Sequence, residues 1–320
     1  MVSILLKNKI KLGGIIMLNY IILFVGFIML IKGADVFVDG SSSIAKKFGI
    51  PSIVVGLTIV AMGTSAPEFS VSIQSALAGM NDMSIANVVG SNIFNLLVVL
   101  GCSAVINKLK IDNYKDILIM FIVGLLMLLC SIDGALGVCD GLFLLTIFVF
   151  YILSLLFKAF KEKQKDEKEE KQKPLSITIC LCIIGLTGII WGGNLVVNSA
   201  SVIAQQLGMS ENLVGLTVVA IGTSLPELVT SLVATKKGEL DIAIGNVVGS
   251  NIFNMLLILG AASVINPMTV SFFALTDLVF VIAAMLTFII LTFKEKTLNK
   301  HQGIFLVLMY VVYIIYTIIR

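Results

Sequence analysis

Charged residues are scarce in this sequence. Only 13% of its 320 residues are Asp, Glu, Lys or Arg, whereas 58% are hydrophobic and the mean hydropathy is +1.08. Soluble domains carry about a quarter charged residues. The composition therefore excludes a secreted enzyme, a nucleic-acid-binding protein and a disordered scaffold, and it indicates an integral membrane protein.

Residues that would support metal or covalent chemistry are also few. The only histidine, His301, lies beside the last apolar stretch, and the five cysteines are odd in number and lie mainly in or beside apolar stretches. Neither a disulfide framework nor a zinc or copper site is indicated. The sequence also lacks a nucleophile with an adjacent base and a glycine-rich phosphate loop. We therefore expect no enzymatic activity, no cofactor and no drive by ATP.

Apolar stretches dominate the chain instead. About 20 apolar residues are needed to cross a bilayer as a helix. Ten stretches meet this length, near residues 18–40, 50–78, 83–106, 114–132, 138–157, 175–199, 209–235, 241–265, 272–293 and 303–319. They predict an all-α protein with ten transmembrane helices, and an even number of crossings places both termini on one side.

The lysines predict the orientation. Of the 22 basic residues, 17 lie in the gaps that follow odd-numbered stretches. The positive-inside rule makes those gaps cytoplasmic, so we expect a multi-pass protein of the plasma (inner) membrane with both termini outside. Lys7, Lys9 and Lys11 disagree, and Met17 is an alternative start that would remove them. No small-residue cleavage site follows the first stretch, so we retain it as a span.

The two halves of the chain resemble each other. Residues 56–101 align without gaps onto residues 215–260, at an offset of 159, with 26 identities in 46 positions. Because each half has five spans, the second half is inverted. We predict two five-helix repeats, 1–157 and 175–320, joined by a charged cytoplasmic linker at 158–174. Inverted repeats with matching polar breaks are typical of secondary transporters whose site lies near the bilayer midplane.

One glutamate lies in the middle of an apolar span in each half. A carboxylate there costs on the order of 3 kcal/mol and is by default a functional candidate. Glu68 and Glu227 each follow a proline, Pro67 or Pro226, which should break the helix because proline lacks an amide hydrogen. The carbonyl end of the preceding half-helix favours cations. The alternative is a protonated carboxyl group that is hydrogen-bonded within a helix interface.

Polar side chains with helical spacing accompany both glutamates. In the span that contains Glu68, one helix face carries Thr64, Glu68 and Ser72, with Ser65 adjacent. The other polar residues with this spacing are Asn87, Ser91 and Asn95 in the next span, and Thr223, Ser224, Ser231, Asn246, Ser250 and Asn254 in the second half. Such stripes can also be interhelical hydrogen-bonding contacts. We expect the serines and asparagines at 91, 95, 250 and 254 to line a site, and for Asn87 and Asn246 both roles stay open.

This set of oxygens suits a hard cation. Calcium takes six to eight oxygen ligands from carboxylates, carbonyls and hydroxyls in flexible geometry. Two ionised glutamates carry a charge of about −2, which balances one calcium ion or two sodium ions. Binding of either species, but not of both together, is what coupled exchange requires.

Four motifs carry a family resemblance. They are GTSAPE at 63–68, GTSLPE at 222–227, ANVVGSN at 86–92 and GNVVGSN at 245–251. Through them the sequence resembles the sodium/calcium exchangers of the calcium/cation antiporter superfamily, in particular the compact prokaryotic type. The resemblance implies ten helices in two inverted five-helix repeats. It also implies electrogenic exchange of several sodium ions, usually three, against one calcium ion by alternating access.

The resemblance further implies roles for individual residues. Calcium would be bound by Glu68 and Glu227 together with Thr64 and Thr223, partly through backbone oxygen. The sodium sites would share the two glutamates and add Ser65, Ser91, Ser224, Ser250 and the carbonyl groups of Ala61 and Ala220. The first and sixth helices, around Gly33 and Gly192, would be lightly packed and would slide past a fixed core.

This sequence departs from the family pattern at Asn254. Some members have an aspartate there, opposite an asparagine equivalent to Asn95, so here the glutamates would be the only membrane-buried charges. The calcium-sensing domains found between the halves of animal relatives are also absent from the sequence.

Other functions stay open at this stage. A proton/calcium antiporter needs only that Glu68 and Glu227 accept protons. A passive cation channel is disfavoured, because channels usually form a pore on an axis along the membrane normal. The expected partners are calcium and sodium ions and the lipid bilayer, with no nucleic acid and no obligate protein partner.

Overall fold

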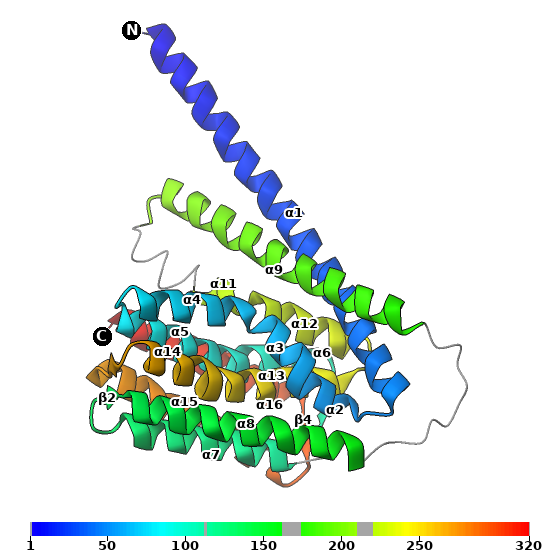
Figure 1. Ribbon diagram of the computed structural model, residues 1–320. Helices are drawn as coiled ribbons and strands as arrows, with labels where there is room; N and C mark the ends of the chain where they lie inside the picture. Colours follow the sequence, from blue (N-terminus) through cyan, green and yellow to red (C-terminus); the bar gives the residue numbers. More distant parts are fainter. Residues whose placement is uncertain (1, 112–113, 162–173, 210–219, 320) are drawn as a thin grey trace.

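The computed structural model describes residues 2–111, 114–161, 174–209 and 220–319, the side chains of residues 2–16 and 220 excepted. Helices account for nearly all of these residues (Figure 1). The first half contains α1 (Val2–Phe48), α2 (Ser52–Val55), the π-helix η1 (Gly56–Val60), α3 (Ala61–Thr64), α4 (Ala66–Leu77), α5 (Asn81–Phe94), the π-helix η2 (Asn95–Val99), α6 (Leu100–Ile106), β1 (Leu109–Lys110), α7 (Tyr114–Ser131), β2 (Ala135–Leu136) and α8 (Val138–Lys161).

The second half follows the same order. Its described elements are α9 (Leu175–Gln206), α11 (Ala220–Thr223), α12 (Leu225–Lys236), α13 (Leu240–Phe253), the π-helix η4 (Asn254–Ile258), α14 (Leu259–Ile265), β3 (Met268–Thr269), α15 (Phe272–Phe293), β4 (Thr297–Leu298) and α16 (Lys300–Ile319). From α3 to β1, every element recurs 159 positions later with the same length. The sequence similarity between the halves is therefore reproduced as local structure.

Eight described helices are long and apolar enough to cross a membrane. The helix pair Ser52–Thr64 and Ala66–Leu77, bent by 49°, would be a ninth span if it crosses as one unit. The expected span at 209–235 is described only from Ala220 onward, and its residues 210–219 lie outside the described part. The expected count of ten therefore stays a prediction. Most other boundaries agree within a few residues, but α1 and α9 extend well past the expected ends at 40 and 199.

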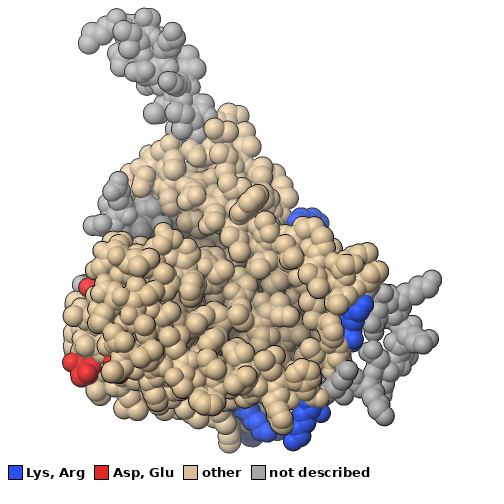
Figure 2. All heavy atoms as spheres, viewed as in Figure 1, with Lys and Arg blue, Asp and Glu red and all other residues tan. Residues whose placement is uncertain are grey.

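Burial separates an inner from an outer layer of helices. In the 26-residue stretches Asn81–Ile106 and Leu240–Ile265, 72% and 94% of the most apolar window is buried, against 17% in α16. The outer helices expose large apolar side chains such as Phe157, Ile290 and Val312. Figure 2 shows that lysines gather at one end of the visible face and acidic residues at the other, with an uncharged belt between them. This distribution suits a protein surrounded by lipid.

Helices α1 and α9 lie side by side at one side of the bundle (Figure 1). Their backbones meet at glycines, because a Cβ on Gly33 would lie 2.7 Å from the backbone nitrogen of Ile189, and one on Gly192 would lie 2.5 Å from that of Leu30. Close approach through small residues is a common way for membrane helices to associate. The two helices are thus tightly packed against each other.

A cluster of charges ties α1 to the turn between α12 and α13. The ammonium group of Lys237 lies 2.8 Å from a carboxylate oxygen of Asp35 and 2.6 Å from one of Asp39, and Ser42 donates to Glu239 at 2.5 Å. Burial lowers the pKa of Lys237, but the hydrogen bonds and charges of the two aspartates outweigh it, so the net pKa is raised. Lys237 therefore stays charged at neutral pH.

Two small strand pairs connect the halves at the ends of the bundle. β1 pairs antiparallel with β4, and β2 pairs antiparallel with β3. Each pair joins one strand from the first half to one from the second. Strands of two residues are too short to produce an alternating pattern, so they could not be predicted from the sequence.

The glycine contact between α1 and α9 leads to a matched test. Gly192→Ala should lower the free energy of unfolding by about 1–3 kcal/mol, because the added methyl group overlaps the backbone of Leu30. In Gly193→Ala the added methyl group would meet its nearest atom, in Pro226, at 3.7 Å, so this variant should be as stable as the parent protein. Thermal unfolding of the two purified variants in detergent measures the difference; equal loss in both would contradict the packing described.

Candidate functional site

Each glutamate follows a break in its helix. α3 ends at Thr64 and α4 begins at Ala66, so Ser65 lies between them with φ −80° and ψ 7°. In the second half Ser224 takes the same place between α11 and α12, with φ −91° and ψ 6°. In both halves the proline stands in the first turn of the following helix, where its missing amide hydrogen costs no hydrogen bond. The breaks expected from Pro67 and Pro226 are therefore confirmed.

The serine at each break binds the glutamate of the other half. Ser65 Oγ donates to Glu227 Oε1 at 2.9 Å, and Ser224 Oγ donates to Glu68 Oε1 at 3.0 Å. All four side chains are fully buried. The two breaks thus face each other, and neither glutamate is held by its own half alone.

The threonines at the breaks contact the asparagines of the following spans. Thr64 Oγ1 donates to Asn246 Oδ1 at 2.9 Å, and Thr223 Oγ1 donates to Asn87 Oδ1 at 3.4 Å. Each asparagine in turn donates to the backbone carbonyl of the glutamate in its own half, Asn87 to Glu68 at 3.2 Å and Asn246 to Glu227 at 3.4 Å. These contacts again connect the halves.

Ser91 and Ser250 lie beside the two carboxyl groups. Ser91 Oγ lies 3.4 Å from Glu68 Oε1 and 3.0 Å from Ser224 Oγ, the hydroxyl that donates to the same carboxylate oxygen. Ser250 lies beside the Glu227 carboxyl group. Ser250 Oγ is fully buried and has no hydrogen-bond partner in the described part of the chain. Both serines thus lie next to the glutamate of their own half.

Asn95 and Asn254 begin the π-helices η2 and η4 and are fully buried. Asn254 donates to Asn92 Oδ1 at 3.0 Å, whereas neither polar atom of Asn95 has a partner among the residues described. π-Helical turns are rare and occur often at functional sites.

The backbone ligands inferred from the resemblance are less fully described. The carbonyl of Ala61 accepts from the amide of Ser65 at 3.0 Å and lies 3.4 Å from Thr64 Oγ1. Ala220 begins α11, but its side chain and the residues before it lie outside the described part.

Several buried oxygens of the site lack a hydrogen bond. Among the described residues, Glu68 Oε2, Glu227 Oε2, Ser250 Oγ and Asn254 Oδ1 are buried without a partner. No lysine or arginine in the described ranges forms an ion pair with either glutamate. Burying a carboxylate without a counter-charge is costly. A bound cation would supply both the missing charge and the missing partners.

The atoms of this site that could bind a cation are all oxygens. Carboxylates, hydroxyls, amide oxygens and backbone carbonyls meet at the two breaks. Within the described ranges no group of three or more histidine, cysteine or acidic residues could hold a metal ion, so the paired glutamates are the strongest candidate. Oxygen ligands with flexible geometry suit sodium and calcium better than zinc or copper.

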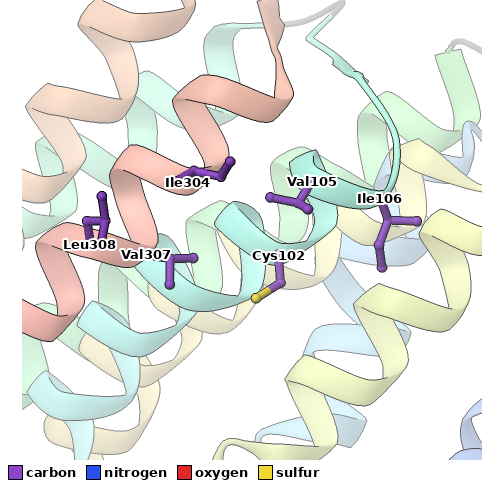
Figure 3. Close-up of a pocket in the computed structure, with 6 residues that line it drawn as sticks. All are labelled: Cys102, Val105, Ile106, Ile304, Val307 and Leu308. Atoms are coloured by element: carbon purple, nitrogen blue, oxygen red, sulfur yellow. The ribbon is translucent and has the colours of Figure 1, made fainter.

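An apolar cavity elsewhere does not fit a cation. It lies between α6 and α16, measures about 350 Å³ and is lined by Cys102, Val105, Ile106, Ile304, Val307 and Leu308 (Figure 3). Its lining offers no oxygen ligand from a side chain. The cavity is therefore distinct from the candidate site in chemistry as well as in lining residues.

The sequence indicated most of the residues that meet here, but it missed two. Asn92 and Asn251 stand inside the repeated NVVGSNIFN motif and are buried beside the site, where Asn92 accepts from Asn254 and donates to the carbonyl of Asn251 at 3.4 Å. Their identity between the halves was a signal that could have found them. The sequence also left Asn87 and Asn246 open, and the structure shows them bound to threonines and to glutamate carbonyls.

Known proteins resemble this chain in sequence. The family model described as sodium/calcium exchanger protein matches residues 18–157 and 177–319. The sodium/calcium exchanger MaX1 of Methanosarcina acetivorans is 33% identical, with 94% of this chain and 98% of MaX1 covered. The inner membrane protein YrbG of Escherichia coli strain K12 is 33% identical, with 77% of this chain and 79% of YrbG covered.

A solved structure agrees with the fold. The sodium-calcium exchanger NCX_Mj, soaked with 10 mM Na⁺ and 10 mM Sr²⁺, superposes with a TM-score of 0.84 at 32% identity, covering 93% of this chain and 98% of that one. The protein is thus an all-α, multi-pass membrane transporter and not an enzyme. It belongs to the sodium/calcium exchanger family, and its class of activity is cation/calcium exchange.

The paired carboxyl groups lead to a prediction about binding. Glu68→Gln and Glu227→Gln each remove one charge while keeping the side chain's shape, so each should weaken calcium binding by at least about tenfold and leave the protein folded. Titration calorimetry on the purified protein measures the affinity. Glu295→Gln makes the same chemical change at an exposed position and should bind as the parent does. Unchanged affinity in either buried variant would show that the cation binds elsewhere.

Proposed function

We propose that this protein exchanges sodium for calcium across the membrane by alternating access, electrogenically. The observation that carries the proposal is the pair of fully buried glutamates, each with one unpartnered carboxylate oxygen and with no cationic side chain paired to it in the described residues. Two ionised carboxylates balance one calcium ion or two sodium ions, and a third sodium ion, which the family resemblance implies, makes the exchange electrogenic. Both ions compete for the same two charges, so one displaces the other.

The roles proposed for the individual residues are those that the family resemblance implies. Calcium takes the Glu68 and Glu227 carboxylates together with Thr64 and Thr223. Sodium uses the same glutamates with the serines at both breaks, the two serines of the following spans and the carbonyls before the breaks, namely Ser65, Ser224, Ser91, Ser250, Ala61 and Ala220. Asn95 and Asn254 line the space beside them. The relatives MaX1 and NCX_Mj, named sodium/calcium exchangers, support this choice of ions.

We also propose ten transmembrane helices in two inverted five-helix repeats, 1–157 and 175–320, joined by a cytoplasmic linker at 158–174. The recurrence of elements at an offset of 159 supports the repeats. The lysines gathered at one end of the bundle support a cytoplasmic linker with both termini outside (Figure 2). The relative YrbG, an inner membrane protein, supports the same location here.

Movement of α1 and α9 would alternate the access. Their glycine contacts are closer than ordinary side-chain packing, so the two helices would move as one unit over the inner helices. The inner layer, together with α4 and α12, which carry the glutamates, would stay fixed.

A transport assay identifies the ion whose gradient drives calcium uptake. The purified protein is reconstituted into vesicles loaded with sodium and diluted into sodium-free buffer, and uptake of radioactive calcium is followed. We expect uptake that requires internal sodium and is absent from choline-loaded vesicles. Uptake that follows a pH gradient in sodium-free medium would contradict the proposal and identify a proton/calcium antiporter.

The serines beside the glutamates should affect sodium more than calcium. Ser91→Ala or Ser250→Ala removes a hydroxyl ligand of sodium, so the sodium concentration for half-maximal exchange should rise about three- to tenfold, while calcium affinity changes less. Ser154→Ala removes a hydroxyl from the outer helix α8, where it donates to the carbonyl of Tyr151, and should leave both unchanged. If these variants instead lose more calcium affinity than sodium dependence, the serines are calcium ligands and not sodium ligands.

A further inference from the structure

The apolar cavity between α6 and α16 is open toward the lipid. The two helices cross in backbone contact, because a Cβ on Gly303 would lie 2.5 Å from the carbonyl oxygen of Gly101. Beside this crossing lies the cavity of about 350 Å³ that Figure 3 shows. Four of its lining side chains are 38–57% exposed, namely Val105, Ile106, Ile304 and Leu308. The cavity is therefore a groove on the surface that faces the membrane.

Two lysines lie at one end of this groove. α16 begins at Lys300, and Ile304 and Leu308 follow at four-residue spacing, so the three residues share one face of the helix. A rise of about 1.5 Å per residue places Lys300 about 6 Å from Ile304 along the axis. On the other wall, Lys108 follows Ile106, the last residue of α6, by two positions. Both lysines are exposed, and neither forms an ion pair within the described ranges.

Three further lysines extend the positive charge across the strand pair that joins the two helices. β1 follows α6 and β4 precedes α16, and the amide of Ile111 donates to the carbonyl of Lys296 at 2.8 Å. The three are Lys110 in β1 and Lys294 and Lys296 before β4, all of them exposed. In the described segments 107–111 and 294–300, Glu295 is the only acidic residue. We call the five residues Lys108, Lys110, Lys294, Lys296 and Lys300 the lysine surface.

The other strand pair has the same local structure without the lysines. β2 pairs with β3 as β4 pairs with β1, and a Cβ on Gly141 of α8 would lie 2.6 Å from the carbonyl oxygen of Gly260 in α14. The positions equivalent to the lysine surface hold Ile132, Gly134, Val138, Pro267 and Thr269. The strand pairing and the helix crossing therefore do not require lysine. The positive-inside rule accounts for lysines at one end of the bundle, but not for their position beside an apolar groove.

Lys296 stands where glycine would fit better. Its φ is 50°, and among the described residues it is the only residue other than glycine with a positive φ. Gly134, which directly precedes β2 as Lys296 precedes β4, has a φ of 83°. Side chains disfavour this left-handed conformation, so the lysine is held there at a cost in stability. Strain of this kind is often found where the side chain has a function.

We propose that the groove between α6 and α16 binds an anionic phospholipid. Its phosphate group lies at Lys108 and Lys300, and one acyl chain follows the groove from Ile304 to Leu308. The apolar lining needs no polar partner, and the lysines at its end need a negative charge; an anionic phospholipid supplies both in one molecule. Basic pockets between transmembrane helices on the cytoplasmic side, where the proposed orientation places this end, are typical of anionic headgroup sites. This site shares no residue with the cation site.

Native mass spectrometry of the delipidated full-length protein in detergent tests the proposal. Phosphatidylglycerol and phosphatidylcholine with identical acyl chains are titrated separately. The parent should bind a first phosphatidylglycerol at least about tenfold more tightly than a first phosphatidylcholine, because two lysines act on the negative headgroup. The double variant Lys108→Gln/Lys300→Gln should lose this preference and bind both lipids as the parent binds phosphatidylcholine. Inorganic phosphate should not displace the lipid, because it has no acyl chain.

The groove itself is tested separately from the charge. Val105→Trp fills the groove with a ring and should weaken the first binding step of both lipids about tenfold, while the preference for phosphatidylglycerol persists. Its control is Ile290→Trp, which adds the same ring to an exposed position of α15 and should change neither affinity. The control for the lysines is Lys47→Gln/Lys161→Gln, which removes the same charge from the ends of α1 and α8. It should keep the full preference.

A further variant remains informative if the double lysine variant does not fold. Lys296→Gly removes one charge of the lysine surface together with the strained conformation. The preference for phosphatidylglycerol should fall about threefold, while the unfolding temperature stays the same or rises. A lower unfolding temperature with unchanged preference would show that Lys296 serves the fold, and would contradict the proposal.

Three other results would overturn the proposal. Equal affinity of the parent for the two lipids would show that the lysines do not select a headgroup. An equal loss of preference in Lys47→Gln/Lys161→Gln would show a general attraction of lipid to this end of the bundle. A dimer that Val105→Trp dissociates would show that a second copy of the chain occupies the groove. None of these measurements involves sodium or calcium, so their outcome is independent of the proposed exchange.

Discussion

Two carboxyl groups that are fully buried between broken helices place a strong electrostatic demand on the structure around them. Their charges repel each other, and in the described part of the chain no lysine or arginine pairs with them. Serine hydroxyls satisfy one oxygen of each carboxyl group, and the second oxygen has no partner among the described residues. In the function proposed above, a transported cation completes this arrangement.

The site exists only where the two halves meet. Ser65 binds Glu227 and Ser224 binds Glu68, so each half supplies the hydrogen-bond donor that the other half's acid requires. One feature breaks this symmetry. Lys237 binds Asp35 and Asp39 of α1, whereas the equivalent positions in the other half hold Ala78, Asn194 and Asn198. The α1–α9 unit is thus tied by charge to the inner layer at one end only, among the residues described.

Much of this arrangement could be predicted from the sequence because its signals are strong. A glutamate after a proline in an apolar stretch, repeated at a fixed offset, indicates both a helix break and a site, and the structure places Glu68 and Glu227 accordingly. The contacts between the serine of one half and the glutamate of the other could not be predicted from the sequence, because the spacing of residues along one helix does not identify the helix that packs against it. The sequence for the same reason left Asn246 open between two roles, and gave no sign that α1 and α9 meet at backbone distance.

The central claim is that one cation lies between the two buried glutamates. Crystals of the protein soaked with Sr²⁺, a divalent ion with a strong anomalous signal, would test it most directly. The account predicts a single strong anomalous peak within coordination distance, about 2.3–2.7 Å, of carboxylate oxygens of both Glu68 and Glu227. A peak that contacts only one glutamate, or that lies away from both helix breaks, would contradict it.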